Sequence, residues 1–247
     1  GCTVLNRKFS LIVATADRLT ETERLLKSLA DQSYRNFELL LVDYGSDGKL
    51  SGLIERYRSQ LPSLKVLAQP GSGLSKSRNA GLKQAIGDIV AFPDDDCWYP
   101  SDLLETVNNY FDQHADIDVL SGRVIGPHGR EVAGRFVTGN TRVNKLNVWR
   151  AASSVSIFIQ KALIDQVGQF DELLGVGAKS IYLSGEETDY IVRLLEKGAR
   201  IYFDVMIKVF HPDPLQEYDE KAVQRAYGYG CGAGRVLKKH HYPLWFK

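Results

Sequence analysis

Three consecutive carboxylates, Asp94, Asp95 and Asp96, follow an apolar run in AFPDDDCWYP, residues 91–100. Adjacent negative charges repel one another, so the triplet requires a nearby cation or free contact with solvent. Two carboxylates on a short turn, together with phosphate oxygens of a substrate, make a good Mg²⁺ or Mn²⁺ site, and the neighbouring carboxylate can accept hydrogen bonds from a ribose. A solvated acidic turn is the plainer alternative. The position directly after a buried strand favours the binding site.

A second acidic group, Glu186, Glu187 and Asp189, follows a glycine at a predicted helix start in SGEETDYIVRLLEKG, residues 184–198. Acids in the first turn of a helix stabilise its dipole, which is the simple structural explanation. Three acids in four positions exceed what capping needs, and a carboxylate held there can act as a general base on a hydroxyl.

Arg78 and His211 are the remaining candidates. Arg78 follows the glycine turn of GSGLSKSRNAG (71–81), which matches neither a dinucleotide fingerprint nor a P-loop. A guanidinium on the first turn of the next helix can face a nucleotide, whereas the alternative for Arg78 and Lys76 is a solvent-facing helix charge. His211 ends a predicted strand in VFHPDP (209–214) and is either structural or a metal ligand. Ser153 and Ser154 lie in no G-x-S-x-G elbow, which disfavours a serine hydrolase.

The first hundred residues alternate between predicted strands and helices. Branched apolar runs predict strands at 9–13, 37–42, 64–68 and 88–92, with helices between them at about 20–30, 50–60 and 75–87. Thr20 and Glu23 form a capping-box pattern. This alternation predicts an α/β fold with a doubly wound, mostly parallel sheet, whose ligands bind at the carboxyl ends of the strands. Asp43, the Gly71 turn and the aspartates all fall at those ends.

The regular alternation of strands and helices does not continue in the second half of the chain. A helix capped by Ser101, a strand near 117–126, a polar irregular stretch at 127–149 and further strand and helix patterns follow one another without a linker or repeat. No domain boundary is indicated, and we expect the second half to be a lobe packed onto the first sheet.

The composition restricts the partners. The 247 residues carry 31 basic and 30 acidic side chains, so no basic footprint indicates nucleic-acid binding. Three widely separated cysteines, Cys2, Cys97 and Cys231, form no disulfide framework or zinc spacing, which favours a reducing compartment. No apolar run is long enough for a membrane span, and the start lacks the apolar region of a signal peptide. The basic and aromatic end GRVLKKHHYPLWFK (234–247) suits contact with an anionic membrane surface, and a frayed helix end is the alternative.

Four segments together resemble family 2 glycosyltransferases of the GT-A fold, from about residue 9 to about 214. They are SLIVATADR (10–18), LLKSLADQSYRNFELLLVDYGSDG (25–48), GLSKSRNAGLKQAIGDIVAFPDDDCWYP (73–100), and FDELLG (170–175) with SGEETDYIVRLLEKG (184–198). The sequence departs from the family pattern at Ala14 and Ala16, where proline and tyrosine are usual, at Tyr44, and at Glu187, where aspartate is commoner.

The resemblance implies a role for each candidate residue. The nucleotide-sugar-binding set is Thr15 and Asp43 for base and ribose, Arg78 for base or diphosphate, and Asp94 and Asp95 for the ribose side. Asp96 and His211 would hold a divalent metal. Glu187 would be the catalytic base, with Glu186 and Asp189 as the neighbouring acids. Residues 1–100 would be the nucleotide-sugar-binding half of one GT-A domain, and residues 101–247 its acceptor-binding and catalytic half, with a membrane-associating C-terminal end.

The implied activity is an inverting glycosyl transfer that depends on Mn²⁺ or Mg²⁺. The expected donor is a nucleoside-diphosphate sugar, a UDP-sugar foremost, and the acceptor a glycan or lipid-linked saccharide. Bacterial surface polysaccharide synthesis, such as that of lipopolysaccharide O-antigen, is the implied setting, in the cytoplasm or peripherally on the inner face of the cytoplasmic membrane. A sugar nucleotidyltransferase and a non-catalytic nucleotide- or glycan-binding relative are the alternatives; the first would need a glycine-rich loop after the first strand, where ATADRLTE has no glycine.

Overall fold

The computed structural model describes residues 4–69, 71–132, 136–213 and 219–246, so Cys2 lies outside the described residues. The strands are β1 (Phe9–Thr15), β2 (Phe37–Asp43), β3 (Leu64–Ala68), β4 (Ile89–Ala91), β5 (Val119–Ile125), β6 (Thr141–Arg142), β7 (Ile157–Gln160) and β8 (Ile201–Phe210). The helices are α1 (Leu19–Ala30), α2 (Ser51–Arg58), α3 (Leu74–Leu82), α4 (Leu103–Gln113), α5 (Val148–Ala151), α6 (Lys161–Val167), α7 (Glu186–Glu196) and α8 (Glu220–Lys239), with short 3₁₀ turns at Ser154–Ser156 and Leu244–Phe246.

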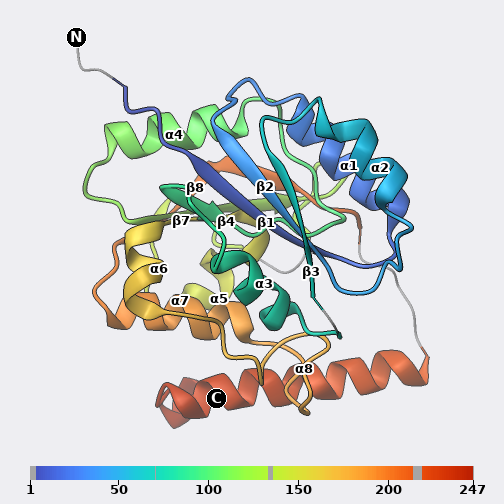
Figure 1. Ribbon diagram of the computed structural model, residues 1–247. Helices are drawn as coiled ribbons and strands as arrows, with labels where there is room; N and C mark the ends of the chain where they lie inside the picture. The colour runs from blue at the N-terminus through green and yellow to red at the C-terminus, as the bar shows by residue number, and fades with distance from the viewer. Residues whose placement is uncertain (1–3, 70, 133–135, 214–218, 247) are drawn as a thin grey trace.

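All eight strands form one sheet in the order β3-β2-β1-β4-β7-β5-β8-β6. In Figure 1, α1, α2 and α4 lie above this sheet, while α3, α6, α7 and α8 lie below it. Strands β3, β2, β1 and β4 run parallel, which confirms the predicted doubly wound α/β fold. Strand β2 is buried from Phe37 to Val42, as a strand covered by helices on both faces requires. The crevice between β1 and β4 is the switch point of this strand order, where ligands bind in such sheets.

The second half extends the same sheet and is not a separate lobe packed onto it. Strand β7 pairs antiparallel with both β4 and β5, and β8 pairs parallel with β5. This continuity explains why no linker or boundary is visible in the sequence. Just after β4, Trp98 forms an isolated antiparallel bridge with Phe210 at the end of β8. This bridge holds the segment after β4, from the first half of the chain, next to the end of β8, from the second half.

Among the elements predicted from the sequence, the helix ends differ most from the structure. Helix α1 begins after Arg18 without a side-chain cap, and Thr22 turns inward to Thr15, so the Thr20–Glu23 capping box is wrong. Helix α4 begins after Asp102 and is not capped by Ser101. Helix α3 ends at Leu82 and not at Gly87. No helix within the described ranges combines the length and apolar composition needed to cross a bilayer.

Candidate functional site

The predicted site residues follow the strands that flank the β1–β4 crevice. Thr15 is the last residue of β1, and Asp94 to Asp96 follow β4 by a few residues. The pairing of Trp98 with Phe210 places His211 beside the aspartates, with its Nε2 atom 3.4 Å from Asp96 Oδ1. The structure thus gathers one acidic cluster from segments more than 100 residues apart in the sequence.

Two arginines, Arg18 at the N-cap position of α1 and Arg24 within the helix, supply positive charge to this cluster. Arg18 Nη1 lies 2.7 Å from Asp95 Oδ1 and 3.0 Å from Asp96 Oδ2, while half of its side chain remains exposed. Thr15 Oγ1 donates to the other Asp95 oxygen at 3.0 Å, and Arg24 donates to the Asp96 carbonyl at 2.8 Å. Burial raises the pKa of Asp95, although Arg18 opposes the shift. Arg18 therefore offsets part of the repulsion within the triplet.

Arg78 contacts the cluster from the protein interior and is only 2% exposed. Its Nη2 atom lies 3.4 Å from Asp94 Oδ1 and 3.1 Å from Ser154 Oγ, and its Nη1 atom lies 3.7 Å from Glu186 Oε1. Nη1 has no hydrogen-bond partner among the described residues. The solvent-facing alternative for Arg78 is thus wrong: this buried guanidinium joins Asp94, which follows β4, to Glu186 of α7.

The first turn of α7 presents Glu186 and Glu187 to Arg78 and Ser154. Glu187 Oε2 accepts a hydrogen bond of 2.7 Å from the Ser154 amide. Burial, with Glu187 beside it, raises the pKa of Glu186 to about 7, although Arg78 opposes the shift. Desolvation likewise raises the pKa of Asp94 to about 6, against the effect of Arg78. Near neutral pH the site therefore holds more carboxyl groups than its arginines can balance.

Side chains of the types that hold metal ions also gather at this place. Ligand atoms of Asp94, Asp96, Cys97 and His211 all lie within 4.8 Å of one another. Asp96 Oδ1 is buried and has no hydrogen-bond partner among the described residues. His211 Nδ1 lies 2.7 Å from the Pro212 carbonyl, an acceptor, which leaves the Nε2 lone pair of a neutral imidazole facing Asp96. Burial raises the pKa of the Cys97 thiol, so the sulfur is a poor ligand for a hard cation. Asp94, Asp96 and His211 fit a divalent cation such as Mn²⁺.

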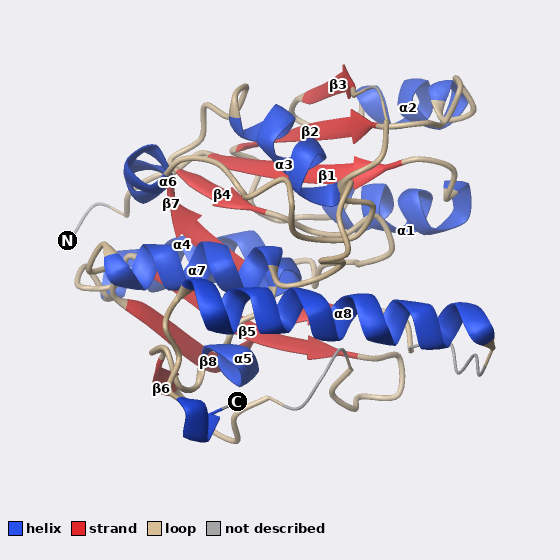
Figure 2. Cartoon of the chain, turned by 90° about the horizontal axis from the view of Figure 1, so that it is seen from below, coloured by secondary structure: helices blue, strands red, loops and turns tan. Residues whose placement is uncertain are grey.

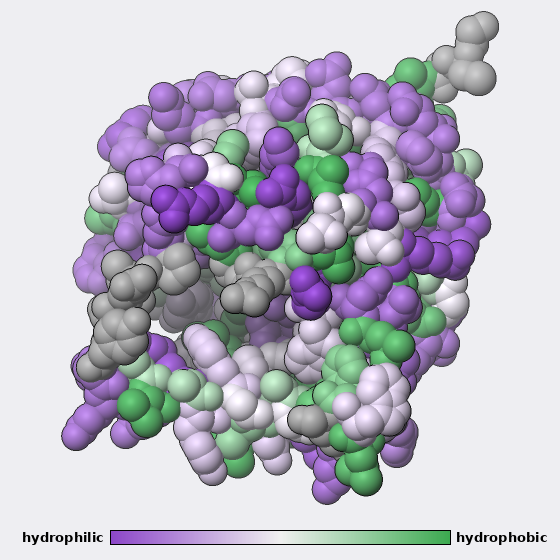
Figure 3. Space-filling view, turned by 180° about the vertical axis from the view of Figure 1, so that it is seen from behind, coloured by the Kyte–Doolittle hydropathy of each residue, from purple (hydrophilic) through white to green (hydrophobic). Residues whose placement is uncertain are grey.

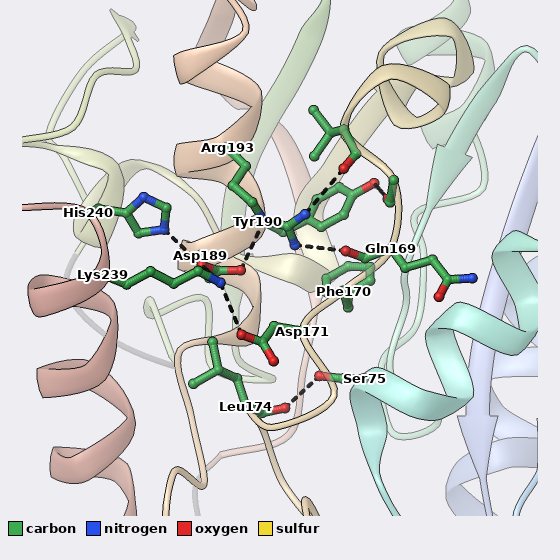
Figure 4. Close-up of polar contacts among 12 residues, drawn as sticks. Ser75, Gln169, Phe170, Asp171, Leu174, Asp189, Tyr190, Arg193, Lys239 and His240 are labelled. Atoms are coloured by element: carbon green, nitrogen blue, oxygen red, sulfur yellow. Dashed lines mark hydrogen bonds and ion pairs between the residues drawn. The ribbon is translucent and has the colours of Figure 1, made fainter.

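Two predicted residues have other partners. Asp43 accepts hydrogen bonds from the backbone of Gly45 and Ser46 and from the Ser46 hydroxyl in the turn after β2. Burial would raise the pKa of Asp43, but these hydrogen bonds outweigh it and lower the pKa. Asp189 is fully buried and contacts Arg193, Lys239 and His240, as Figure 4 shows. Its carboxylate is engaged by the C-terminal part of the chain.

Sequence reasoning missed Arg18 and Ser154 as parts of the site. Arg18 could have been found, because it directly precedes α1 at the edge where the aspartates lie and those acids need a cation. Ser154 carries no comparable signal, since its contacts with Arg78 and Glu187 join residues from three separate segments.

The comparisons with known sequences agree with one another on the family of this chain. The family model described as glycosyl transferase family 2 matches residues 10–163. The poly(ribitol-phosphate) beta-N-acetylglucosaminyltransferase TarS of Staphylococcus aureus is 37% identical over 129 residues, which cover 51% of this chain and 22% of TarS. The glycosyltransferase AglE of Haloferax volcanii is 23% identical over 214 residues, 82% of this chain and 66% of AglE. The match with TarS thus spans about a fifth of that protein's length.

Solved structures agree on the fold. The crystal structure of S. aureus TarS 1–349 has a TM-score of 0.71 and 25% identity, covering 94% of this chain and 72% of that chain. Its complex with UDP-GlcNAc has the same TM-score at 26% identity, covering 94% and 73%. The mannosyltransferase PcManGT of Pyrobaculum calidifontis, in complex with GDP-Man and Mn²⁺, has a TM-score of 0.66 at 19% identity, covers 95% and 68%, and supports the fold alone.

The raised pKa of Glu186 predicts a pH-dependent effect of Glu186→Gln. The folded protein binds this proton more tightly than the unfolded chain, so wild-type stability falls as pH rises from about 4.5 through about 7. A glutamine at this position does not titrate, so the variant does not undergo this loss of stability. Urea unfolding in a metal chelator should show the free energy of unfolding of the variant, relative to wild type, rising by about 2 kcal/mol between pH 5 and pH 8. The exposed Glu55→Gln is the matched control, and an equal difference at both pH values would contradict the assignment.

Proposed function

The chain belongs to glycosyl transferase family 2, and from that premise we propose that it moves a sugar from a nucleoside-diphosphate sugar to an acceptor hydroxyl. One observation carries the proposal. The aspartates after β4, the buried Arg78 and the carboxylate of Glu187 converge at the switch point of the sheet. A donor diphosphate needs cationic and metal-binding groups, and an acceptor hydroxyl needs a base; both are present at one edge.

For the donor, we propose a UDP-sugar bound by residues 1–100. The related TarS has been crystallised with UDP-GlcNAc and with UDP, which supports uridine over other bases. Thr15, Asp43, Asp94 and Asp95 would face base and ribose. Arg78, whose Nη1 atom has no hydrogen-bond partner among the described residues, would reach the diphosphate. Residues 101–247 would supply the acceptor side and the catalytic acids.

For the metal, we propose Mn²⁺ or Mg²⁺ held by Asp96 and His211, with Asp94 beside them. The Oδ1 atom of Asp96 faces the imidazole and accepts no hydrogen bond from the described part of the chain, so a cation there would satisfy both groups. The nitrogen ligand favours Mn²⁺ over Mg²⁺. When bound, the metal supplies Lewis-acid stabilisation of the negative charge that develops on the leaving diphosphate.

For the chemistry, we propose Glu187 as the base. Its Oε2 atom is held by the Ser154 amide, which leaves Oε1 to take the proton of the acceptor hydroxyl. The acceptor oxygen then bonds to the anomeric carbon from the face opposite the diphosphate. The bond from that carbon to the phosphate oxygen breaks, its electron pair leaves with the nucleoside diphosphate, and the configuration inverts. Burial raises the pKa of Glu186 to about 7, so this carboxyl group still holds its proton in much of the population at neutral pH and is less available to accept another.

For the acceptor, we propose a surface saccharide or a lipid-linked glycan in a bacterial cell. The name of TarS gives poly(ribitol-phosphate) as its acceptor polymer, which supports a polymer of the cell surface here, whether of that type or the O-antigen of lipopolysaccharide. We place this activity at the cytoplasmic face of the cytoplasmic membrane.

The rival activities have less support. A sugar nucleotidyltransferase would need a glycine-rich loop after β1, where this chain has Ala16, Asp17 and Arg18. A pure binding module would need no carboxylate held against the Ser154 amide, so the position of Glu187 favours a catalyst.

Asp96→Ala should abolish metal-dependent nucleotide binding, because it removes the only carboxylate oxygen of the cluster that is buried and lacks a hydrogen bond among the described residues. Calorimetric titrations of UDP, GDP, dTDP and CMP, each with and without Mn²⁺, would measure this. We expect wild type to bind UDP tightly only with Mn²⁺, and the exposed Asp116→Ala to behave like wild type. Manganese-dependent affinity that survives in Asp96→Ala would overturn the metal assignment.

Glu187→Gln should bind UDP with Mn²⁺ as wild type does but lose transfer by about 10²–10⁴-fold, because an amide cannot take the hydroxyl proton. Turnover of UDP-GlcNAc with poly(ribitol-phosphate), or with the lipid-linked acceptor that wild type uses, would measure this. Glu187→Asp keeps a carboxylate and should retain more activity than the amide. Near-normal turnover by Glu187→Gln would move the base to Glu186 or Asp189.

Exposed hydrophobic side chains in the C-terminal part of the chain support the proposal that it contacts a membrane. Val223 and Tyr227 on α8, and Leu244 and Trp245 after it, are exposed, and hydrophobic surface gathers along the lower edge of the molecule in Figure 3. Aromatic and basic side chains together suit an anionic lipid surface. Sedimentation with phosphatidylglycerol vesicles should therefore remove the protein from solution and weaken at high salt. A Leu244→Ser/Trp245→Ser double variant that sediments as well as wild type would contradict this contact.

A further inference from the structure

Asp189 lies two residues after Glu187 and its carboxylate is entirely buried. Arg193 of the same helix lies 3.1 Å from one oxygen, while Lys239 Nζ and His240 Nε2 each lie 2.8 Å from the other (Figure 4). A buried carboxylate is stable only when paired. Two of its three partners come from the end of α8, about 50 residues later in the chain, so the first turn of α7 depends on that end.

Lys239 also reaches the loop that precedes α7. Its ammonium lies 3.0 Å from Asp171 Oδ2, and further along this loop the Leu174 carbonyl accepts a hydrogen bond of 2.6 Å from Ser75 of α3 (Figure 4). In the same loop, Gly175 packs against the Glu186 carboxylate, which a Cβ atom there would approach to 3.1 Å. A single lysine therefore connects the loop that frames Glu186 with the helix that carries Glu187.

Helix α8 holds the turn into α7 by close backbone packing. Leu183 N donates to the Gly228 carbonyl at 3.1 Å, and Ser184 Oγ donates to the Tyr229 carbonyl at 2.8 Å. A Cβ atom on Gly232 would lie 2.3 Å from the Ser184 carbonyl oxygen, so only glycine permits this approach. Figure 2 shows α8 lying alongside α7. The segment at the start of α7 is thus held by the middle of α8 at Leu183 and Ser184 and by the end of α8 at Asp189.

We propose that Lys239 and His240 are positioning residues for the transfer step: they clamp the first turn of α7 and the loop at 168–185 so that Glu187 faces the acceptor hydroxyl. This inference rests on the proposed function above. Glu187 shares the first turn of α7 with Asp189, so a shift of that turn would move the Glu187 carboxylate away from the Ser154 amide that donates to it. The aspartates after β4 are held by Arg18, Thr15 and Arg78 instead. Loss of the clamp should therefore impair transfer and spare donor binding.

The test compares Lys239→Met with Lys238→Met, the exposed neighbour on the same helix, in the full chain and well below the unfolding temperature. We expect Lys239→Met to keep its affinity for UDP and Mn²⁺ within about two-fold, to lower kcat at least ten-fold with little change in donor KM, and to speed amide hydrogen exchange at residues 183–190 but not at 91–97. Lys239→Arg, which keeps the charge, should recover part of the kcat.

Equal kcat and equal exchange at 183–190 in the two methionine variants would overturn the clamp. Parallel losses of UDP affinity and kcat, with faster exchange at 91–97 as well, would also overturn it, because they indicate a merely structural lysine. Should Lys239→Met fail to fold, the same measurements on Lys239→Arg and Lys238→Arg decide the question. If wild type transfers no sugar, the proposed function fails, whereas the exchange at 183–190 still tests the clamp by itself.

Discussion

The balance of charge at the carboxyl edge of the sheet is the constraint on which the rest of the site depends. Two arginines, Arg18 and Arg78, contact the four nearest carboxylates, those of Asp94, Asp95, Asp96 and Glu186. Burial at this edge raises the pKa of Asp94 and Glu186, and Asp96 keeps an oxygen without a hydrogen bond in the described structure. A divalent cation would offset the excess of negative charge at this edge, and the diphosphate of a donor would bind through that cation and the arginines.

The continuous sheet is what makes the cluster possible. Strands β1 and β4 set the crevice, and the bridge between Trp98 and Phe210 brings the end of β8 to the end of β4. Arg24 adds to the same junction, because its guanidinium lies 4.0 Å from the centre of the Trp98 ring while it donates to the Asp96 carbonyl. The groups that we propose to bind donor and metal therefore follow strands of one sheet, whereas Glu187 lies at the start of a helix that packs below this sheet.

The sequence allowed the parallel strands, their carboxyl-edge residues and the family to be predicted, because buried strands and acidic turns leave local patterns. Three other features were not predicted, and among them only Arg18 had a signal in the sequence. The antiparallel entry of β7 between β4 and β5 is a long-range pairing without a local signature. Arg18 takes the N-cap position before α1, whereas the capping-box pattern predicts Thr20 there. Asp189 matched the pattern of a catalytic acid, and its partners Lys239 and His240 lie too far along the chain for spacing to reveal them.

The most direct test of the account is the anomalous scattering of Mn²⁺ in crystals of the protein grown with UDP. We expect one peak between Asp96 Oδ1 and His211 Nε2, beside the diphosphate, with Arg18 still paired to Asp95. Density for UDP at the β1–β4 crevice with no manganese peak between those two side chains would contradict the central claim that the acidic cluster is a metal-assisted donor site.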